Sequence, residues 1–363
     1  MIGRGIDQIL PTPSEPGLFE PAVESAIEYV ALAEAVSGPI PRRVGADYLW
    51  GDAKQAWSRL KPDARIINLE TAVTANRDAD PTREIHYRMH PANVSCLTAA
   101  QIDCCVLANN HVLDWGRRGL EDTLRSLQSA GLKTAGAGRD EFAASSPAVI
   151  GVGGRRLLVY GLALTSSGVP QAWKATGTLP GVNWLGDLSR RTVDAIGRWV
   201  ERDRRPGDRV VLSVHWGENW GYEISEPERE FAHQLLDRAG VDLVHGHSSH
   251  HPKGIEVHRG KAILYGCGDL LNDYEGIGRY DAFRPNLSLM HFPKIDVGSG
   301  ELVAMTLVPM RVSRFQLHRA SAEEADWRAG MMNRECRKLG VGVAHRSDGT
   351  LALEWSQGHS RVA

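Results

Sequence analysis

The stretch VDLVHGHSSHH, residues 241–251, contains the pattern that decides the fold. Its apolar start is typical of a buried strand, and this strand runs directly into four closely spaced histidines. Gly246 lies between the first two, where we expect a tight backbone turn that aims nearby imidazoles at one point. Clustered histidines beside Asp, Asn and Glu are typical of a transition-metal site.

Three other apolar runs end in the same way. Residues 64–69 lead into Glu70, residues 103–108 into Asn109, Asn110 and His111, and residues 209–214 into His215. Ligands of an open α/β sheet bind beyond the carboxyl ends of its strands. Four such ends would gather one Glu, one Asn and several His. This is the ligand set of a hydrolytic site with two cations about 3.5–4 Å apart.

Strand-like and helix-like stretches alternate along most of the chain. Further strands are predicted at 147–152, 156–163, 241–245, 261–265 and 301–308, with helices around 120–127, 193–200 and 227–236. This order predicts an α/β core over residues 1–310, with central sheets flanked by helices. Residues 311–363 contain a polar helical stretch and a short β-like end, and we interpret them as a C-terminal appendage packed on the core.

Composition argues against several classes of protein. The formal net charge of the 363 residues is -2, and no basic stretch is interleaved with aromatic residues, which disfavours nucleic-acid binding. No apolar run reaches the roughly 18 residues of a membrane helix. The N-terminus is too polar for a signal peptide, and five cysteines form no disulfide pattern. The chain as written is therefore expected to be cytoplasmic, with reduced cysteines.

Each of these residues also has an ordinary structural interpretation. A single strand that ends in Asn is normally a turn or a helix cap, and a lone histidine is normally a hydrogen-bonded structural residue. Trp216, Trp220 and Tyr222 would either form a substrate wall or pack beneath the His215 loop. Lys253 and Asp269 are weaker candidates for the lining of a cleft.

Four sequence blocks together resemble a known family. They are INLET (67–71), LANNHVLDWGRRGLEDTL (107–124), HWGENW (215–220) and HGHSSHHPKGIEVHRGKAILYGCGDLLND (245–273). In this order they resemble the CapA/PgsA poly-γ-glutamate synthesis accessory proteins, and more closely the actinobacterial polyglutamine synthesis accessory proteins. The resemblance covers roughly residues 1–310 and implies the sandwich fold of the calcineurin-like metallophosphoesterases.

The resemblance also implies a role for individual residues. Two divalent transition-metal ions (Mn, Zn, Fe or Co) would be held by the bridging carboxylate Glu70 and by Asn110, His215, His247 and His250. His245 and His251 remain alternative ligands, because the Gly-His-x-x-His spacing differs from the plain His-x-His of phosphoesterases. His111 would protonate the leaving group or stabilise negative charge. Asp114 would fix a histidine ring or cap the helix that follows.

The N-terminus departs from the family pattern. MIGRGID, residues 1–7, resembles the tail of the family's opening motif, which would place Arg4 near the site to grip an anionic group; otherwise Arg4 is a surface residue. The Gly-Asp of that motif, whose Asp normally ligates metal, would precede Met1, and Asp7 does not occupy its position. We therefore expect either a true start upstream, with membrane association or export, or a core that lacks its first strand.

Two functions remain in competition. The first is a metal-dependent hydrolase that acts on a phosphoester or on a γ-glutamyl amide. The second is a non-catalytic accessory subunit of a cell-envelope polymer synthesis or export complex, which the missing Asp favours. The expected partners are an anionic small-molecule or polymer substrate and other polymer-synthesis proteins.

Overall fold

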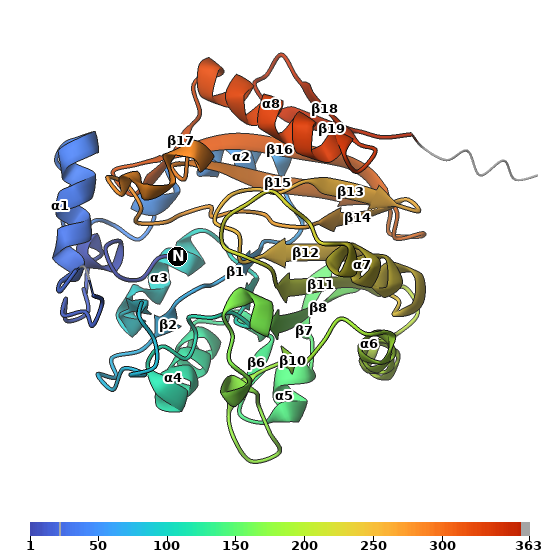
Figure 1. The fold of residues 1–363 in the computed structure, drawn as a ribbon, viewed down its shortest axis with the longest axis horizontal. Helices are drawn as coiled ribbons and strands as arrows, with labels where there is room; N and C mark the ends of the chain where they lie inside the picture. Colours follow the sequence, from blue (N-terminus) through green and yellow to red (C-terminus); the bar gives the residue numbers. More distant parts are fainter. Residues whose placement is uncertain (22, 357–363) are drawn as a thin grey trace, which may run out of the picture.

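The computed structural model describes residues 1–21 and 23–356, which form sheets flanked by helices (Figure 1). The smallest of the three main sheets is parallel. It contains β1 (Ile66–Asn68), β4 (Cys104–Val106) and β5 (Lys133–Ala135), in the order β1-β4-β5. Residues on one face of β4 pack against α3 (Ser95–Ala99) and α4 (Gly116–Ser129), and those on the other face point toward the second sheet.

The second sheet has seven strands and forms the centre of the molecule. Its order is β10 (Trp184–Leu185), β8 (Arg155–Leu164), β11 (Arg209–His215), β12 (Leu243–His247), β14 (Lys261–Leu264) and β13 (Ile255–His258), with β7 (Ala148–Val152) also paired to β8. The neighbouring pairs from β10 to β14 are parallel, and the pairs of β7 and β13 are antiparallel.

Two helices cover the outer face of this sheet. They are α6 (Arg190–Asp203) and α7 (Glu226–Arg238), on one side in Figure 1. Their apolar faces, which include Val193, Ile196 and Phe231, are buried against Leu212 of β11. α7 begins with a capping box at Ser225, which satisfies free amide groups of the first turn.

The third sheet is antiparallel and lies near the C-terminus. It contains β15 (Leu287–Ile295), β16 (Leu302–Ser313), β19 (Leu351–Glu354), β18 (Gly342–His345) and β17 (Gln316–Arg319), and α8 (Ala322–Arg337) packs on it. β16 crosses the predicted boundary between residues 310 and 311. The C-terminal segment therefore continues a sheet that begins before this boundary.

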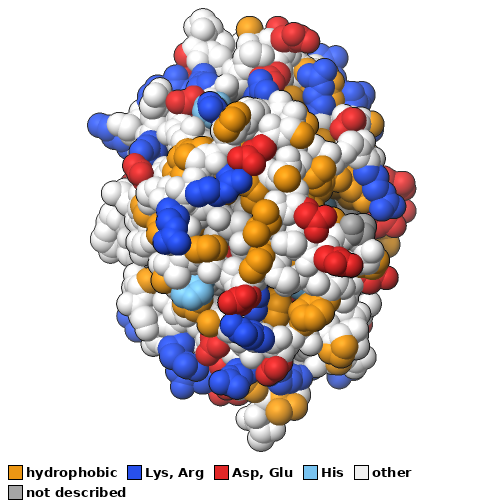
Figure 2. Space-filling view, turned by 90° about the vertical axis from the view of Figure 1, so that its left-hand side faces the viewer, with side chains coloured by type: hydrophobic (Ala, Val, Ile, Leu, Met, Phe, Trp, Pro, Cys, Tyr) orange, Lys and Arg blue, Asp and Glu red, His pale blue; other side chains and the backbone are white. Residues whose placement is uncertain are grey.

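Several short elements remain. Among the described residues they are α1 (Ala26–Ser37), α2 (Ala53–Leu60), α5 (Glu141–Ser145), the short strands β2 (Ala72–Val73), β3 (Arg88–Met89), β6 (Ala137–Gly138) and β9 (Gly181–Val182), and six 3-10 turns. α1 exposes Ile27 and Val36. Basic and acidic side chains are intermixed on the side of the molecule that Figure 2 shows. Within the described ranges, no helix has both the length and the apolar character that a membrane span needs.

The first two sheets approach each other closely at Gly161 of β8. A Cβ atom there would lie 2.7 Å from Cα of Gly136 and 2.9 Å from Cγ1 of Val106. Glycine is therefore required for this approach. The α/β architecture predicted from the sequence is confirmed, and a strand overlaps each apolar run proposed as one, with β12 and β16 extending beyond the predicted ends. All five cysteines are free.

Candidate functional site

The parallel register of β11 and β12 creates one half of the site. His215 lies directly opposite His247, and Ser213 lies opposite His245. β1 and β4, which are also parallel, bring Glu70 and the segment 109–111 to the ends of their own strands. Residues that are far apart in the sequence therefore meet because parallel strands end at the same edge.

A chain of hydrogen bonds connects the two halves. Oδ1 of Asn110 lies 3.1 Å from Nε2 of His215, and Nδ1 of His215 lies 2.7 Å from Nδ1 of His247. Oγ of Ser213 lies 2.9 Å from both Nε2 of His247 and Nδ1 of His245. A bond between two ring nitrogens needs one N–H and one bare nitrogen, so at least one of these imidazoles keeps a lone pair.

Burial keeps these histidines neutral. Desolvation lowers the pKa of His215 to about 4, although the nearby Glu70 carboxylate opposes this shift. The pKa of His247 is lowered well below its usual value, first by desolvation and then by His215 and His245. A neutral imidazole is the form that binds a metal ion, so this environment favours ligation at neutral pH.

Glu70 is buried and held by asparagines. Nδ2 of Asn68 donates to its Oε2 at 2.7 Å, and Asn109 in turn donates to Oδ1 of Asn68 at 3.0 Å. The Glu70 charge raises the pKa of both His215 and His250, although burial acts more strongly on both in the other direction. Glu70 is thus close enough to influence histidines from both loops.

His111 is oriented by Asp114. Its Nδ1 lies 2.7 Å from Oδ2 of Asp114, and this oxygen also accepts the backbone N–H of Tyr87 at 2.7 Å. The Tyr87 ring packs edge-on against His111, with a centroid distance of 4.7 Å. Of the two roles predicted for Asp114, the structure shows contact with a histidine ring, and α4 has no side-chain N-cap. Nε2 of His111 has no recorded partner among the described residues.

His250 interacts with a carboxylate. Its Nδ1 lies 3.1 Å from Oδ2 of Asp269, and the hydroxyl of Tyr274 lies 3.5 Å from its Nε2. Burial lowers the pKa of His250, but the Asp269 charge and hydrogen bond outweigh it and the net shift is upward. His251 points elsewhere: its ring nitrogens contact Pro252 O and Gly221 N, each at 3.1 Å.

Arg4 is buried and fully engaged within the protein. Its guanidinium binds Asp273 through Nε and Nη2, at 2.8 and 2.7 Å, and its Nη1 contacts Glu20 at 3.1 Å. It also stacks over the rings of Tyr29 and Tyr87. A substrate anion would have to compete with two carboxylates for Arg4. Binding of a substrate anion by Arg4 stays a prediction. Arg4 and His111 both contact the ring of Tyr87.

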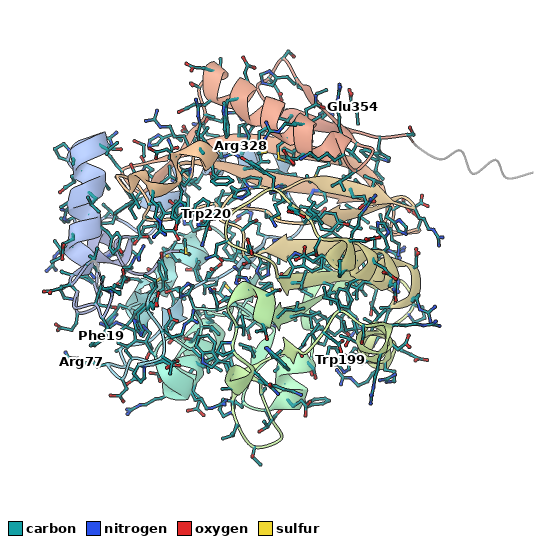
Figure 3. All side chains as sticks on the ribbon, in the orientation of Figure 1. Phe19, Arg77, Trp199, Trp220, Arg328 and Glu354 are labelled. Carbon is teal, nitrogen blue, oxygen red and sulfur yellow. The ribbon has the colours of Figure 1, made fainter. Side chains whose placement is uncertain are left out.

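Other residues singled out in the sequence divide between packing and the site. Trp216 is buried and donates to Tyr265 O at 2.9 Å, as expected for packing. Trp220 (Figure 3) lies beside His250, with ring centroids 5.4 Å apart, and stacks on Tyr280. Lys253 donates to Glu223 O at 3.0 Å.

The interpretation of Gly246 was wrong. Gly246 lies inside β12 and forms no turn. A Cβ atom there would lie 2.4 Å from Tyr265 O, so glycine is needed for the close approach of neighbouring backbone. The irregular backbone begins at Ser248, where φ is 113°. Residues other than glycine rarely adopt this conformation.

Comparison with known proteins identifies the family. The model of the family described as bacterial capsule synthesis protein PGA_cap matches residues 1–274. The chain belongs to the PGA_cap family. It is also 46% identical, over 355 residues, to a protein of Mycobacterium tuberculosis strain H37Rv named probable polyglutamine synthesis accessory protein. This match covers 97% of the chain and 93% of that relative.

Two Bacillus proteins are more distant relatives. The PGA biosynthesis protein CapA of Bacillus subtilis is 26% identical over 209 residues, which cover 57% of this chain and 52% of the relative. The capsule biosynthesis protein CapA of Bacillus anthracis is 28% identical over 195 residues, covering 53% and 45%. The predicted relationship to the CapA proteins is therefore confirmed.

A cavity of about 730 Å³ opens beside the site of this PGA_cap protein. Glu70, His247 and Asp269 line it, together with residues of β1 and β15. Within the described residues β1 pairs with β4 only, and β15 pairs with β16 only, so each has one edge without a partner strand. The expectation that the core lacks one strand stays a prediction, and both of these edge strands line the cavity.

The donor chemistry of the site fits divalent metal ions. Glu70 offers a carboxylate, Asn110 an amide oxygen and His215, His247 and His250 imidazoles, a combination that suits transition metals. The carboxylate and imidazole ligand atoms of this site are less closely grouped than those of a second cluster. Within residues 1–21 and 23–356, three His, Cys, Asp or Glu ligand atoms lie within 4.8 Å of one another only at His233, Glu256 and His258.

Several residues of the site were missed or ranked low. Asn109 and Ser213 belong to its hydrogen-bond network, and Tyr87 packs on His111. Ser213 had a usable signal, because it precedes His215 by two residues in a strand and so shares its face. Asp269 was only a candidate for cleft lining, yet it interacts with His250. No feature of the sequence indicated that Tyr87 would lie against His111.

Proposed function

We propose that this PGA_cap protein supports polyglutamine or poly-γ-glutamate synthesis as a metal-dependent hydrolase with a metallophosphoesterase-like centre. The observation that carries the proposal is the meeting of Asn110, His215 and His247, with Glu70 close enough to act on His215. Neutral buried imidazoles beside a carboxylate are suited to hold Mn, Zn, Fe or Co. The names of its relatives support a role in glutamyl-polymer or capsule synthesis.

The proposed ligands are Glu70, Asn110, His215, His247 and His250. Two divalent ions bound there would supply Lewis acidity and an activated water for attack on a phosphoester or a γ-glutamyl amide. Asn68 would hold the Glu70 carboxylate in position through its hydrogen bond, and Asn109 would in turn orient Asn68.

His111 is the proposed proton donor. Asp114 accepts from Nδ1 and thereby leaves Nε2 free to face the substrate. When the ring is protonated, Nε2–H can be transferred to the departing oxygen or nitrogen, and the buried Asp114 carboxylate stabilises the imidazolium. Tyr87 restricts rotation of the ring through its edge contact.

A second candidate function is a non-catalytic accessory subunit. Two observations favour it: within the described residues no three carboxylate or imidazole ligand atoms of the proposed centre lie within 4.8 Å of one another, and Arg4 is engaged by Glu20 and Asp273. In that case the proposed partners are other polymer-synthesis proteins, and the anionic polymer would bind without being cleaved. The cytoplasm is the proposed compartment for the chain as written.

Metal content and turnover distinguish the two functions. Metal-loaded protein would be assayed with a generic phosphodiester and with a γ-glutamyl oligomer. His215→Ala should lose metal and turnover together, because it removes a ligand. His111→Ala is the matched variant: it should retain metal while turnover falls about 10²–10⁴-fold. Metal-loaded protein that cleaves neither substrate would favour the accessory function.

A further inference from the structure

Four side chains on the outer side of the second sheet form a separate cluster. His233 and Asp237 are one turn apart on α7, and Glu256 and His258 are two residues apart on β13. Residues spaced i,i+4 on a helix share a face, as do residues spaced i,i+2 on a strand. A helix face and a strand face thus contribute one histidine and one carboxylate each.

Each histidine of this cluster contacts the carboxylate on the other element. Nε2 of His233 lies 3.0 Å from Oε1 of Glu256, and Nε2 of His258 lies 3.1 Å from Oδ1 of Asp237. The two imidazoles are stacked, with centroids 3.9 Å apart and planes 11° from parallel. Ligand atoms of His233, Glu256 and His258 all lie within 4.8 Å of one another.

We propose that His233, Glu256 and His258 bind one divalent transition-metal ion of the zinc type, and that Asp237, which contacts His258 but lies outside their 4.8 Å group, rotates to become a fourth ligand. Zinc–ligand bonds of about 2.0–2.2 Å in a tetrahedron place neighbouring ligand atoms roughly 3.3 Å apart. The two observed nitrogen–oxygen separations are close to this spacing. A single ion bound to one side of these contacts would replace the protons that the hydrogen bonds now hold.

Two arginines compete with the ion, and their positions make displacement feasible. Arg229 contacts both oxygens of Glu256, at 3.1 and 2.8 Å, but its side chain is 43% exposed and can move into solvent. Arg259, 3.3 Å from Asp237, is 75% exposed. Tyr265 donates to Oε2 of Glu256 at 2.8 Å, which orients the carboxylate and leaves Oε1 toward His233.

This site shares no residue with the proposed PGA_cap centre. Its ligands are only partly exposed, with 26% for the side chain of His233 and 19% for that of His258, so an ion can enter from solvent and still be partly shielded. The bound ion would fasten α7 to β13, the edge strand of the second sheet. The predicted role is therefore a structural metal site, independent of whether the other centre is catalytic.

Cobalt titration tests the proposal directly. The starting protein carries His215→Ala and His250→Ala, which disable the other centre, and is stripped of metal. We expect one equivalent of Co²⁺ to bind with the visible absorption of a low-coordinate nitrogen–oxygen site. Adding His233→Ala should weaken binding at least 10-fold and abolish this absorption, because a ligand is removed. Glu256→Gln should weaken it as well.

His345→Ala is the matched control, because His345 is another exposed histidine, 3.1 Å from Asp326. It should leave the cobalt signal unchanged. Circular dichroism would establish that each variant is folded, and His258→Gln would replace any variant that is not. Absence of cobalt binding to the starting protein, or binding that survives His233→Ala together with His258→Ala, would overturn the proposal.

Discussion

The molecule contains two histidine clusters with the same ring chemistry and opposite surroundings. In the buried cluster, His215 and His247 bond to each other and to the neutral groups of Asn110 and Ser213. In the outer cluster, each of His233 and His258 instead faces a carboxylate. Burial without a charged partner selects the neutral ring in the first cluster, whereas the second cluster supplies carboxylates beside its imidazoles. The two proposed metal sites therefore differ in the groups that surround their histidines.

The largest expected difference is in stability. His247→Ala in metal-free protein should lower the free energy of unfolding by about 2–5 kcal/mol, since it leaves a cavity and deprives His215 and Ser213 of a partner. His233→Ala, at the surface, should cost less than about 1 kcal/mol. Urea unfolding in the presence of a chelator would measure both. Equal losses would contradict the distinction between the clusters.

The next effect is acid sensitivity, for which His251 is a defined reporter. Its ring is buried and desolvation lowers its pKa to about 4, while Nε2 accepts the Gly221 N–H. In the unfolded chain His251 takes up a proton near pH 6.5, whereas in the folded chain it stays neutral until about pH 4. The free energy of unfolding therefore decreases as the pH falls from 6.5 toward 4. The loss at pH 4.5 should be about 2–3 kcal/mol.

Urea unfolding at pH 7 and 4.5 would test this pH dependence. His251→Gln, which cannot titrate, should show a shallower loss between the two values than the unaltered protein. An identical slope in both proteins would show that His251 does not contribute.

A smaller effect is expected from the residue that orients His111. Asp114→Asn preserves the size of the side chain but removes the charge that fixes the ring, so turnover should fall about 10–100-fold while metal content is unchanged. The measurement is turnover and metal analysis of the same preparation. Loss of metal in Asp114→Asn would instead show that the pair supports the ligands.

The smallest effect concerns His250, a proposed ligand whose Nδ1 lies beside the Asp269 carboxylate. Asp269 raises the pKa of His250, so this pair contributes stability at low pH that is lost as the pH rises through the raised pKa. Asp269→Asn should lower the pKa of His250 and change stability by less than about 1 kcal/mol near pH 7. An NMR titration of His250 would follow it, and an unmoved pKa would rule out the pair as the cause.

The sequence predicted the layout of the site better than its details. Apolar runs that end in polar residues correctly placed β1, β4, β11 and β12, because strand burial leaves a strong local pattern. The helix α4 and the histidine loop after β12 also follow from local spacing. The short strands β5 and β13 and the helices α1 and α2 were not predicted. The formation of β5 depends on its pairing with β4. In contrast, β13 pairs with β14 across a two-residue turn and α1 begins with a capping box at Ser25 and Glu28, so these two elements carried local signals that were missed.

The side-chain network was harder to predict because it depends on contacts between residues that are far apart in the sequence. Whether Arg4 faces a ligand or Asp273 depends on a contact between residues 269 positions apart. The cluster of His233 and His258 lies in two elements, α7 and β13, that the sequence does not obviously pair. Contacts of this kind are set by packing of α7 on the sheet, which residue spacing alone does not specify.

The unpaired edge of β1 has a consequence for hydrogen exchange. β4 and β11 each pair with a strand on both sides, whereas β1 pairs only with β4 and borders the cavity on its other side. Backbone amides along β1 should therefore exchange with deuterium faster than those of β11, because fewer contacts resist local opening. Glu70, which follows β1, would then be the most mobile member of the proposed centre. The backbone amides of β1 and Glu70 should gain the most protection from exchange when metal binds, while the amides around His215 change little.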